Sequence, residues 1–192
     1  MNSEPHSASY HGIDFVDTKE YKRFVEFTEA CMEYRYIGIC YGEPGVGKSF
    51  AAEHYLNWDD QIVVSSFVEH LPSTIIEKVE NCRGVLMIAP VVNSPKIVQD
   101  RIKRGIEGFG VARDRMRGET NIVTLIYDAP KLCPLVVVDE ADRLDIKSLE
   151  QLRGIQPIKC IFLSSGHLIT FGKNITHYGS VGRNVQSSKA MA

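Results

Sequence analysis

Residues 36–49 read YIGICYGEPGVGKS, and this stretch decides the fold. Its first part, from Tyr36 to Tyr41, is short, apolar and partly β-branched, which is typical of a buried strand. Its second part, from Gly42 to Ser49, fits the pattern G-x-x-x-x-G-K-[ST] of a phosphate-binding P-loop. The residues that follow, up to Trp58, have a helical composition. The stretch therefore predicts a strand, a glycine-rich turn and a helix, which is the context that a P-loop requires.

Each residue type in this turn has a physical task at an anion. The glycines let the backbone curl so that successive N–H groups point inward, and the next helix presents its positive N-terminal end. Lys48 would reach the β- and γ-phosphates as a catalytic point charge, and the Ser49 hydroxyl would coordinate Mg²⁺. We therefore expect Mg²⁺ and a nucleoside triphosphate, ATP before GTP. The predicted nucleotide-binding residues are Gly42, Glu43, Pro44, Gly45, Val46, Gly47, Lys48, Ser49 and Phe50.

A second stretch, LVVVDE at residues 135–140, supplies two acids at the end of an apolar run. Asp139 is predicted to hold Mg²⁺ through its water shell, and Glu140 to act as the general base on the attacking water. Taken alone, these acids fit a solvated turn equally well. Together with the P-loop they support one site.

A polar group near the γ-phosphate is expected at the end of a neighbouring strand. Ser164 and Ser165 follow the apolar run 160–163 and are the candidates, with Ser165 preferred. An ordinary serine turn before Gly166 is an equal alternative.

The rest of the chain alternates apolar runs with helical patterns. We expect strands at 36–41, 85–89, 135–138 and 160–163, and helices that include 17–35, 74–81, 94–106, 120–129 and 146–153. Residues 62–67 are predicted to be a short strand or irregular. Continuous apolar strands separated by helices favour an α/β fold, with a parallel sheet covered on both faces.

Composition excludes several classes of protein. The chain has 192 residues, with 22 Lys and Arg against 24 Asp and Glu, so a disordered chain or a dedicated nucleic-acid coat is excluded. No apolar run is long enough for a membrane helix, and residues 1–11 lack a signal-peptide core, so we expect a cytoplasmic protein without a membrane partner. Five widely spaced cysteines without a CxxC motif indicate buried thiols.

A basic stretch runs from Arg101 to Arg117. It carries six Arg or Lys against Glu107 and Asp114, a net charge of 6 − 2 = +4. One interpretation is a surface that contacts DNA phosphates without sequence preference. The other is an ordinary solvated helix face.

Several motifs resemble those of AAA+ ATPases. These are the P-loop GEPGVGKS, the run DEADRL at 139–144, LEQLR at 149–153 and APVVNSP at 89–95. More narrowly, they resemble the transposition-regulator branch, which comprises the B protein of phage Mu and the TniB- and TnsC-type ATP-binding proteins. The resemblance covers residues 17–155. It implies that Gly42–Ser49 are Walker A, that Asp139 and Glu140 are Walker B, and that Ser165 stands in for the first sensor.

The resemblance also implies partners and domains. Members bind ATP between adjacent protomers, assemble on DNA and stimulate a transposase. The implied fold is a three-layer P-loop NTPase sandwich, AAA+-like, whose C-terminal lid is absent or truncated because the pattern stops near Ile155. We expect a flexible lead-in at 1–16, an ATP-binding core at 17–165 and an irregular tail at 166–192.

The predicted function is ATP binding and hydrolysis by a regulator of DNA transposition that assembles on DNA. The alternative is a nucleotide-binding module that is hydrolytically silent because C-terminal elements are missing. A small-molecule kinase is disfavoured, because a carboxylate pair after a strand and the lack of an acceptor-binding lid favour water as the acceptor.

Overall fold

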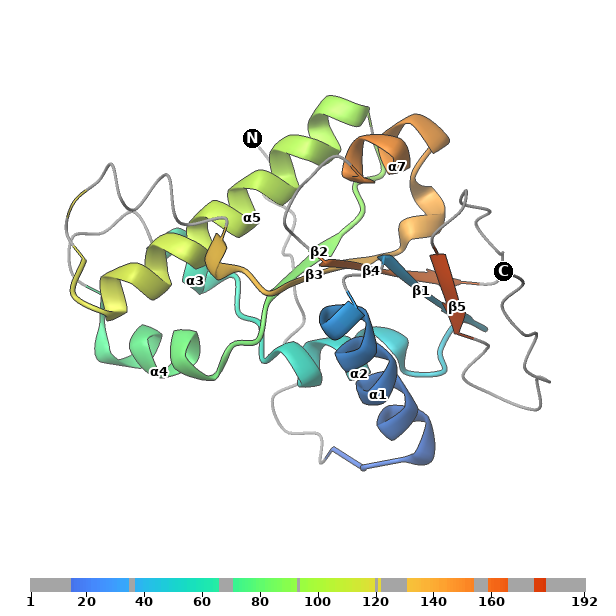
Figure 1. Ribbon diagram of the computed structural model, residues 1–192, viewed down its shortest axis with the longest axis horizontal. Coiled ribbons are helices and arrows are strands. Elements are labelled where there is room, and N and C mark those ends of the chain that lie inside the picture. Colours follow the sequence, from blue (N-terminus) through green and yellow to red (C-terminus); the bar gives the residue numbers. More distant parts are fainter. Residues whose placement is uncertain are drawn as a thin grey trace.

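A computed structural model describes residues 15–34, 37–65, 71–92, 94–119, 121, 131–153, 159–165 and 175–178. Its centre is a parallel sheet of five strands in the order β2-β3-β4-β1-β5 (Figure 1). The predicted α/β class and parallel sheet are confirmed. The strands are β1 (Ile37–Gly42), β2 (Val85–Ile88), β3 (Leu135–Asp139), β4 (Lys159–Ser165) and β5 (Ile175–Tyr178).

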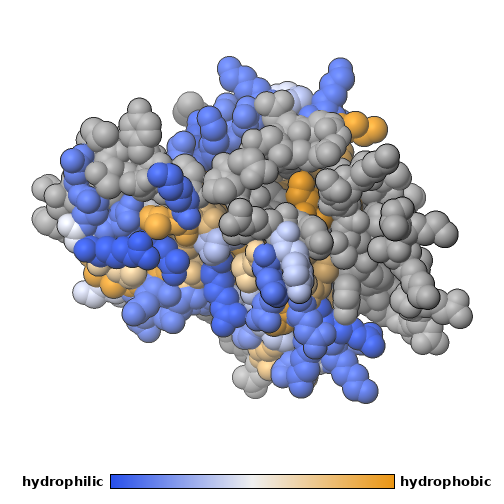
Figure 2. All heavy atoms as spheres, viewed as in Figure 1, coloured by the Kyte–Doolittle hydropathy of each residue, from blue (hydrophilic) through white to orange (hydrophobic). Residues whose placement is uncertain are grey.

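Helices cover both faces of this sheet. In Figure 1, α1 and α2 lie on one side of it, and α5 and α7 lie on the other. On the face drawn in Figure 2, most of the described surface is hydrophilic, and hydrophobic residues appear in smaller areas among the hydrophilic ones. The helices are α1 (Lys19–Tyr34), α2 (Lys48–Leu56), α3 (Gln61–Ser65), α4 (Ser73–Asn81), α5 (Pro95–Met116) and α7 (Ile146–Arg153), with a 3₁₀ turn η1 (Ala141–Arg143).

β3 shows why the sheet needs two covered faces. All five of its residues are buried, and successive side chains point to opposite faces of a sheet. Leu135 and Val137 pack with residues of α1 and α2, whereas Val136 and Val138 pack with residues of α3, α4, α5 and α7. A continuous apolar run is thus the pattern of a strand buried on both sides.

Strand order places the two predicted halves of the site at one edge. β4 lies between β1 and β3, so the P-loop strand and the acidic strand are next-nearest neighbours. In register, Gly42 pairs with Ser165 on β4, and Asp139 pairs with Ile88 on β2. Because all strands run parallel, their carboxyl ends meet at the same edge of the sheet.

The prediction for residues 62–67 was wrong, because this region begins with helix α3. The side chain of Asp59 accepts a hydrogen bond from the backbone N–H of Gln61 at 2.8 Å, which satisfies a donor of the first turn. Ile62 is fully buried against the core. Capping and burial therefore outweigh the β preference of the valines that follow.

Helix α5 is longer than expected and continues past its glycines to Met116. Its start is as predicted, since the Ser94 hydroxyl accepts a hydrogen bond from the backbone N–H of Ile97. The glycines allow close packing: a Cβ atom on Gly105 would lie 2.8 Å from Val85 Cγ1.

The prediction of an irregular tail after residue 165 is also corrected, since Ile175–Tyr178 form β5. This strand is short, and its pairing comes from the edge of β1, from Ile37 to Cys40, which no local pattern announces. The predicted helix at 120–129 lies outside the described residues except for Asn121, and the region after β5, where a lid is expected to be absent or truncated, lies outside them as well.

The described part of the chain contains no helix long and apolar enough to cross a membrane. Cys31, Cys40, Cys82 and Cys133 are buried, as predicted.

Candidate functional site

The predicted P-loop forms the turn between β1 and α2. Gly45 and Gly47 have φ values of +80° and +88°, in the region that favours glycine. A Cβ atom at either position would meet nothing within 4 Å. The backbone conformation, rather than crowding, therefore requires these glycines, and the space in front of the turn is open. The N-cap of α2 is Gly47, which has no side chain to cap the helix, so the positive N-terminal end of α2 faces the turn without a side-chain cap from that residue.

Lys48, the first residue of α2, folds back over this turn. Its Nζ donates hydrogen bonds to the carbonyl oxygens of Gly42 at 3.0 Å and Glu43 at 2.9 Å. The side chain is only 9% exposed, so the two carbonyls offset part of the desolvation of its charge. An ammonium group has three donors, and these two bonds hold it at the mouth of the loop.

Asp139 ends β3 as a buried carboxylate. Its Oδ1 accepts a hydrogen bond from the backbone N–H of Glu140 at 2.7 Å. The charges of both Asp139 and Lys48 affect the pKa of the buried Cys40 thiol on β1. Burial raises that pKa to about 11, Lys48 lowers it and Asp139 raises it. The lysine of the P-loop and the acid of β3 thus act on the same buried atom of β1.

Glu140 adopts a backbone conformation that is uncommon for its residue type. Its φ of 52° and ψ of 35° lie in the left-handed region. Its carboxylate forms an ion pair with the guanidinium of Arg143, on η1. Both side chains are about two-fifths exposed, at 40% and 42%. The predicted general base is therefore next to Asp139 in the chain and is held by a surface partner.

Ser165 lies at the carboxyl end of β4, in register with Gly42. This register places its backbone beside the start of the P-loop, on the strand that separates β1 from β3. Ser164 pairs in the same way with Tyr41. The role of Ser165 as a sensor stays a prediction.

Comparison with known proteins supports the interpretation of the motifs. Residues 31–172 match the AAA domain family. The chain belongs to the AAA domain family. It is also 33% identical over 153 residues to a "Potential ATP-binding protein" of Staphylococcus aureus. That match covers 74% of this chain and 54% of the relative, so the chain spans about half the length of the curated relative it matches.

Membership of this family implies a P-loop NTPase fold and nucleotide binding, as the motif predicted. The narrower resemblance to transposition regulators stays a prediction, and so do the individual site residues.

A hollow of about 240 Å³ opens beside the P-loop of the AAA domain. Aromatic side chains form much of its wall. Phe15 stacks on His54 with 3.5 Å between ring centroids, and it meets Tyr21 edge-on at 4.5 Å. Phe50 of α2 and Val46 of the turn complete the apolar side. Planar apolar walls next to a phosphate-binding turn suit a nucleobase.

Sequence reasoning missed Phe15, which fell within the predicted lead-in. The available signal was an aromatic residue just before the α1 pattern, in the segment FVDT at 15–18. Its packing partner His54 lies on α2, so the contact depends on the tertiary fold.

The residues of the AAA domain also fit a Mg²⁺ ion bound with a nucleotide. Ser49 and Asp139 offer oxygen ligands, which a hard cation prefers. Among the described residues no cluster of three or more His, Cys, Asp or Glu side chains forms a metal cage. Mg²⁺ is usually held by one or two protein oxygens together with substrate phosphates and water.

The basic stretch does not form one exposed face of α5. Arg101, Lys103 and Arg104 are exposed, whereas Arg113 and Arg115 are half-buried. The guanidinium of Arg113 lies 5.3 Å from the centroid of the Phe109 ring. The exposed cations therefore gather in the first half of the helix, where they alternate with Asp100 and Glu107.

Proposed function

We propose that this AAA domain hydrolyses ATP with Mg²⁺, using water as the acceptor of the γ-phosphoryl group. One observation supports the proposal: the P-loop lysine, Lys48, and the buried acid Asp139 follow or end strands of one parallel sheet at the same carboxyl edge. Both charges act on the Cys40 thiol. This combination of a phosphate cradle and a metal-binding carboxylate is the machinery that phosphoryl transfer requires.

In the proposed reaction, the backbone N–H groups of the turn and Lys48 bind the phosphates and stabilise negative charge as it develops. Ser49 and Asp139 would hold the ion, which neutralises charge on the β- and γ-oxygens when bound. Glu140 accepts the proton of the attacking water. The ion pair of Glu140 with Arg143 has to loosen before the carboxylate can face that water.

We further propose that the aromatic hollow takes the adenine base. It adjoins Val46, Gly47 and Lys48, so a nucleotide whose phosphates lie in the turn can place its base against Phe15 and Phe50. Stacking on such rings is favourable for any base, so we expect the hollow to contribute affinity more than selectivity.

The alternative is a domain that binds ATP without hydrolysing it. The ion pair between Glu140 and Arg143 favours this alternative, because the carboxylate then contacts a guanidinium group instead of an attacking water molecule. Phosphate release from the whole chain, compared with Glu140→Gln, separates the two. The hydrolysis proposal expects release from the natural chain, a loss of at least about 100-fold in the variant, and equal ATP affinity in both. Background release from both proteins contradicts it.

For the biological role, we propose regulation of DNA transposition by ATP-dependent assembly on DNA, with a transposase as partner. The motif resemblance supports this role, and so do the exposed cations of α5 and its end, Lys103 and Arg117. Anisotropy of a labelled DNA duplex, titrated with ATP present at several salt concentrations, tests it. Lys103→Ala with Arg117→Ala should flatten the salt dependence. An unchanged slope contradicts the assignment of this surface.

A further inference from the structure

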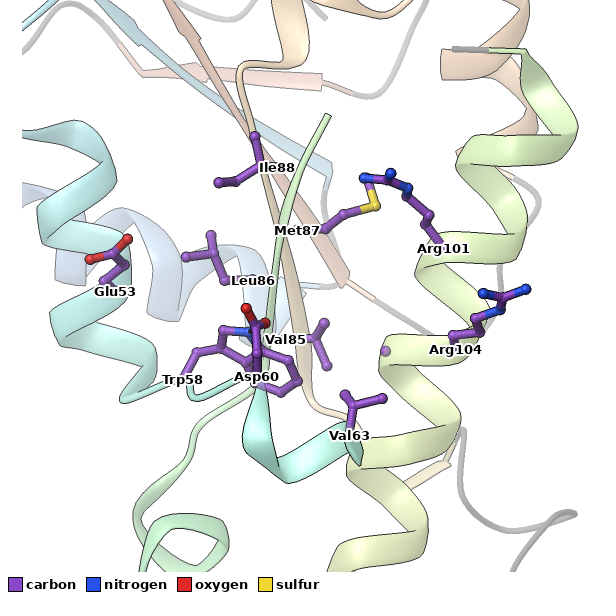
Figure 3. Close-up of a pocket in the computed structure, with 11 residues that line it drawn as sticks. Glu53, Trp58, Asp60, Val63, Val85, Leu86, Met87, Ile88, Arg101 and Arg104 are labelled. Atoms are coloured by element: carbon purple, nitrogen blue, oxygen red, sulfur yellow. Dashed lines mark hydrogen bonds between the residues drawn. The ribbon is translucent and has the colours of Figure 1, made fainter. Parts of the chain in front are cut away.

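The free edge of the sheet carries a second hollow, of about 310 Å³. β2 is the outermost strand, and no described strand pairs with its outer side. The hollow is lined by all four residues of β2, from Val85 to Ile88, so it wraps around the strand and reaches both faces of the sheet. Figure 3 shows Leu86 and Ile88 on the side of α2, and Met87 on the side of α5.

The backbone of β2 makes this hollow suitable for an added strand. An edge strand presents N–H and C=O groups that another extended chain can pair with. Proteins often block such edges with lysine, proline or a charge within the strand. The sequence VLMI of β2 contains none of these. Exposed apolar side chains lie at the end of β2 and shortly after it, since Ile88, Val91 and Val92 are 37%, 81% and 74% exposed.

The two walls of the hollow carry opposite charges. Arg101 and Arg104 come from α5, whereas Glu53 comes from α2 and Asp60 lies beside Trp58 (Figure 3). Asp60 accepts a hydrogen bond from Trp58 Nε1 at 2.9 Å. A strand added along β2 would direct alternate side chains to each wall. Acidic side chains are therefore favoured on the α5 side and disfavoured on the α2 side.

The spacing of the two arginines fits this alternation. Residues three apart on a helix are separated by about 4.5 Å along its axis. Alternate residues of a strand are about 6.6 Å apart. The long side chains of Arg101 and Arg104 can adjust to this difference in spacing. Two acidic side chains at positions i and i+2 of an added strand can therefore each contact one guanidinium group.

A second copy of this chain fits the hollow less well than a free segment. β2 lies between α2 and α5, so the same helices on a second copy would meet these before the two strands could pair. An extended segment without flanking helices avoids such a contact, and it is the occupant that the charges of the two walls are matched to below.

We propose that the β2 edge binds an extended segment of a partner protein by strand addition. The segment carries acidic residues at alternate positions that face Arg101 and Arg104, with apolar residues between them that cover Leu86 and Ile88. This binding site is separate from the nucleotide turn and does not depend on hydrolysis.

The test uses the whole chain and the fluorescein-labelled peptide Ser-Val-Glu-Val-Asp-Val-Thr, followed by anisotropy. We expect saturable binding. The double variant Arg101→Glu, Arg104→Glu should weaken it by about tenfold or more and should favour a peptide with lysine in place of both acids. Lys96→Glu is the matched control, because Lys96 is exposed on the same helix and does not line the hollow, so binding should change less than twofold.

A second peptide tests pairing through the backbone. N-methylation of the residues whose N–H groups would face β2 keeps every side chain and removes those donors, so binding should be lost. The proposal is overturned by any of four results. These are no saturable binding up to about 1 mM, equal losses in the double variant and in Lys96→Glu, full binding of the methylated peptide, or displacement by a single-stranded oligonucleotide at equal charge concentration.

Discussion

Two pairs of glycines in this molecule look alike in sequence and serve different purposes. Gly45 and Gly47 in the P-loop have positive φ values, and a Cβ atom on either would meet nothing within 4 Å. Gly105 and Gly108 in α5 are helical, and a Cβ atom there would lie 2.8 Å from Val85 Cγ1 or 2.9 Å from Val63 Cγ1. In our proposal, Gly45 and Gly47 leave space in front of the turn for a ligand. Gly105 and Gly108 instead allow α5 to pack closely against Val85 and Val63. Substitutions of the turn glycines are therefore expected to reduce ATP affinity most, and substitutions of the α5 glycines to reduce mainly the free energy of unfolding.

The largest effect is expected from Lys48→Ala. The change removes the cation that lies over the turn, and charge-assisted contacts of this kind contribute about 2–3 kcal/mol. ATP affinity, measured by isothermal titration calorimetry, should fall by about 30- to 150-fold. Lys22→Ala, on the exposed side of α1, is the control and should leave affinity unchanged. Full ATP affinity in Lys48→Ala would refute the phosphate role of this lysine.

Gly47→Ala tests both the backbone conformation of the turn and the open space in front of it. The left-handed conformation costs alanine about 1–2 kcal/mol, so the free energy of unfolding should fall by that amount. The new methyl group also enters the space meant for phosphate, so ATP affinity should fall by about tenfold in the folded protein. Urea unfolding and calorimetry measure the two losses separately. A loss of stability without any loss of affinity would contradict the ligand role of this space.

The glycines of α5 should respond differently from those of the turn. Gly108→Ala brings a Cβ atom within 3.1 Å of the backbone Cα of Val63, so overpacking of about 1–3 kcal/mol exceeds the gain in helix propensity of about 1 kcal/mol. Gly105→Ala meets only the end of the Val85 side chain at the closest distance, and its net effect should be smaller. Urea unfolding should rank Gly108→Ala as the less stable variant. ATP affinity should be unchanged in both variants. A loss of ATP affinity without a loss of stability would contradict the structural role assigned to the α5 glycines.

The smallest effect is expected at the aromatic hollow. Phe15→Ala removes a ring that packs against His54, Tyr21 and Phe50. Base stacking contributes about 1–3 kcal/mol, and here neighbouring rings remain, so ATP affinity should fall by about fivefold. Binding of inorganic tripolyphosphate should not change, because it has no base. An equal loss for both ligands would show that Phe15 supports the turn instead.

Local sequence patterns predicted the parts of the molecule whose cause is local. The P-loop turn, the buried runs of β1, β2 and β3, and the serine cap of α5 at Ser94 depend on neighbouring residues. The ion pair of Glu140 with Arg143 is also local, at i and i+3, and the DEADR run contains both residues.

The parts that sequence reasoning missed depend on contacts between distant segments. Helix α3 is helical because Ile62 is buried in a core that the strands build. β5 forms because β1 offers a free edge, and Phe15 is placed by an aromatic group on α2. The insertion of β4 between β1 and β3, which aligns Ser165 with Gly42, is likewise a property of strand order.

The left-handed backbone at Glu140 has a consequence for the long-term fate of this chain. A non-glycine residue in that conformation is disfavoured by about 1–2 kcal/mol, and an ion pair as exposed as the one with Arg143 offsets little of it. Glycine or asparagine would suit the position better as far as folding is concerned. The general-base role that we propose for Glu140 accounts for an acid there, so a lineage released from that role is expected to replace it with a residue that favours stability.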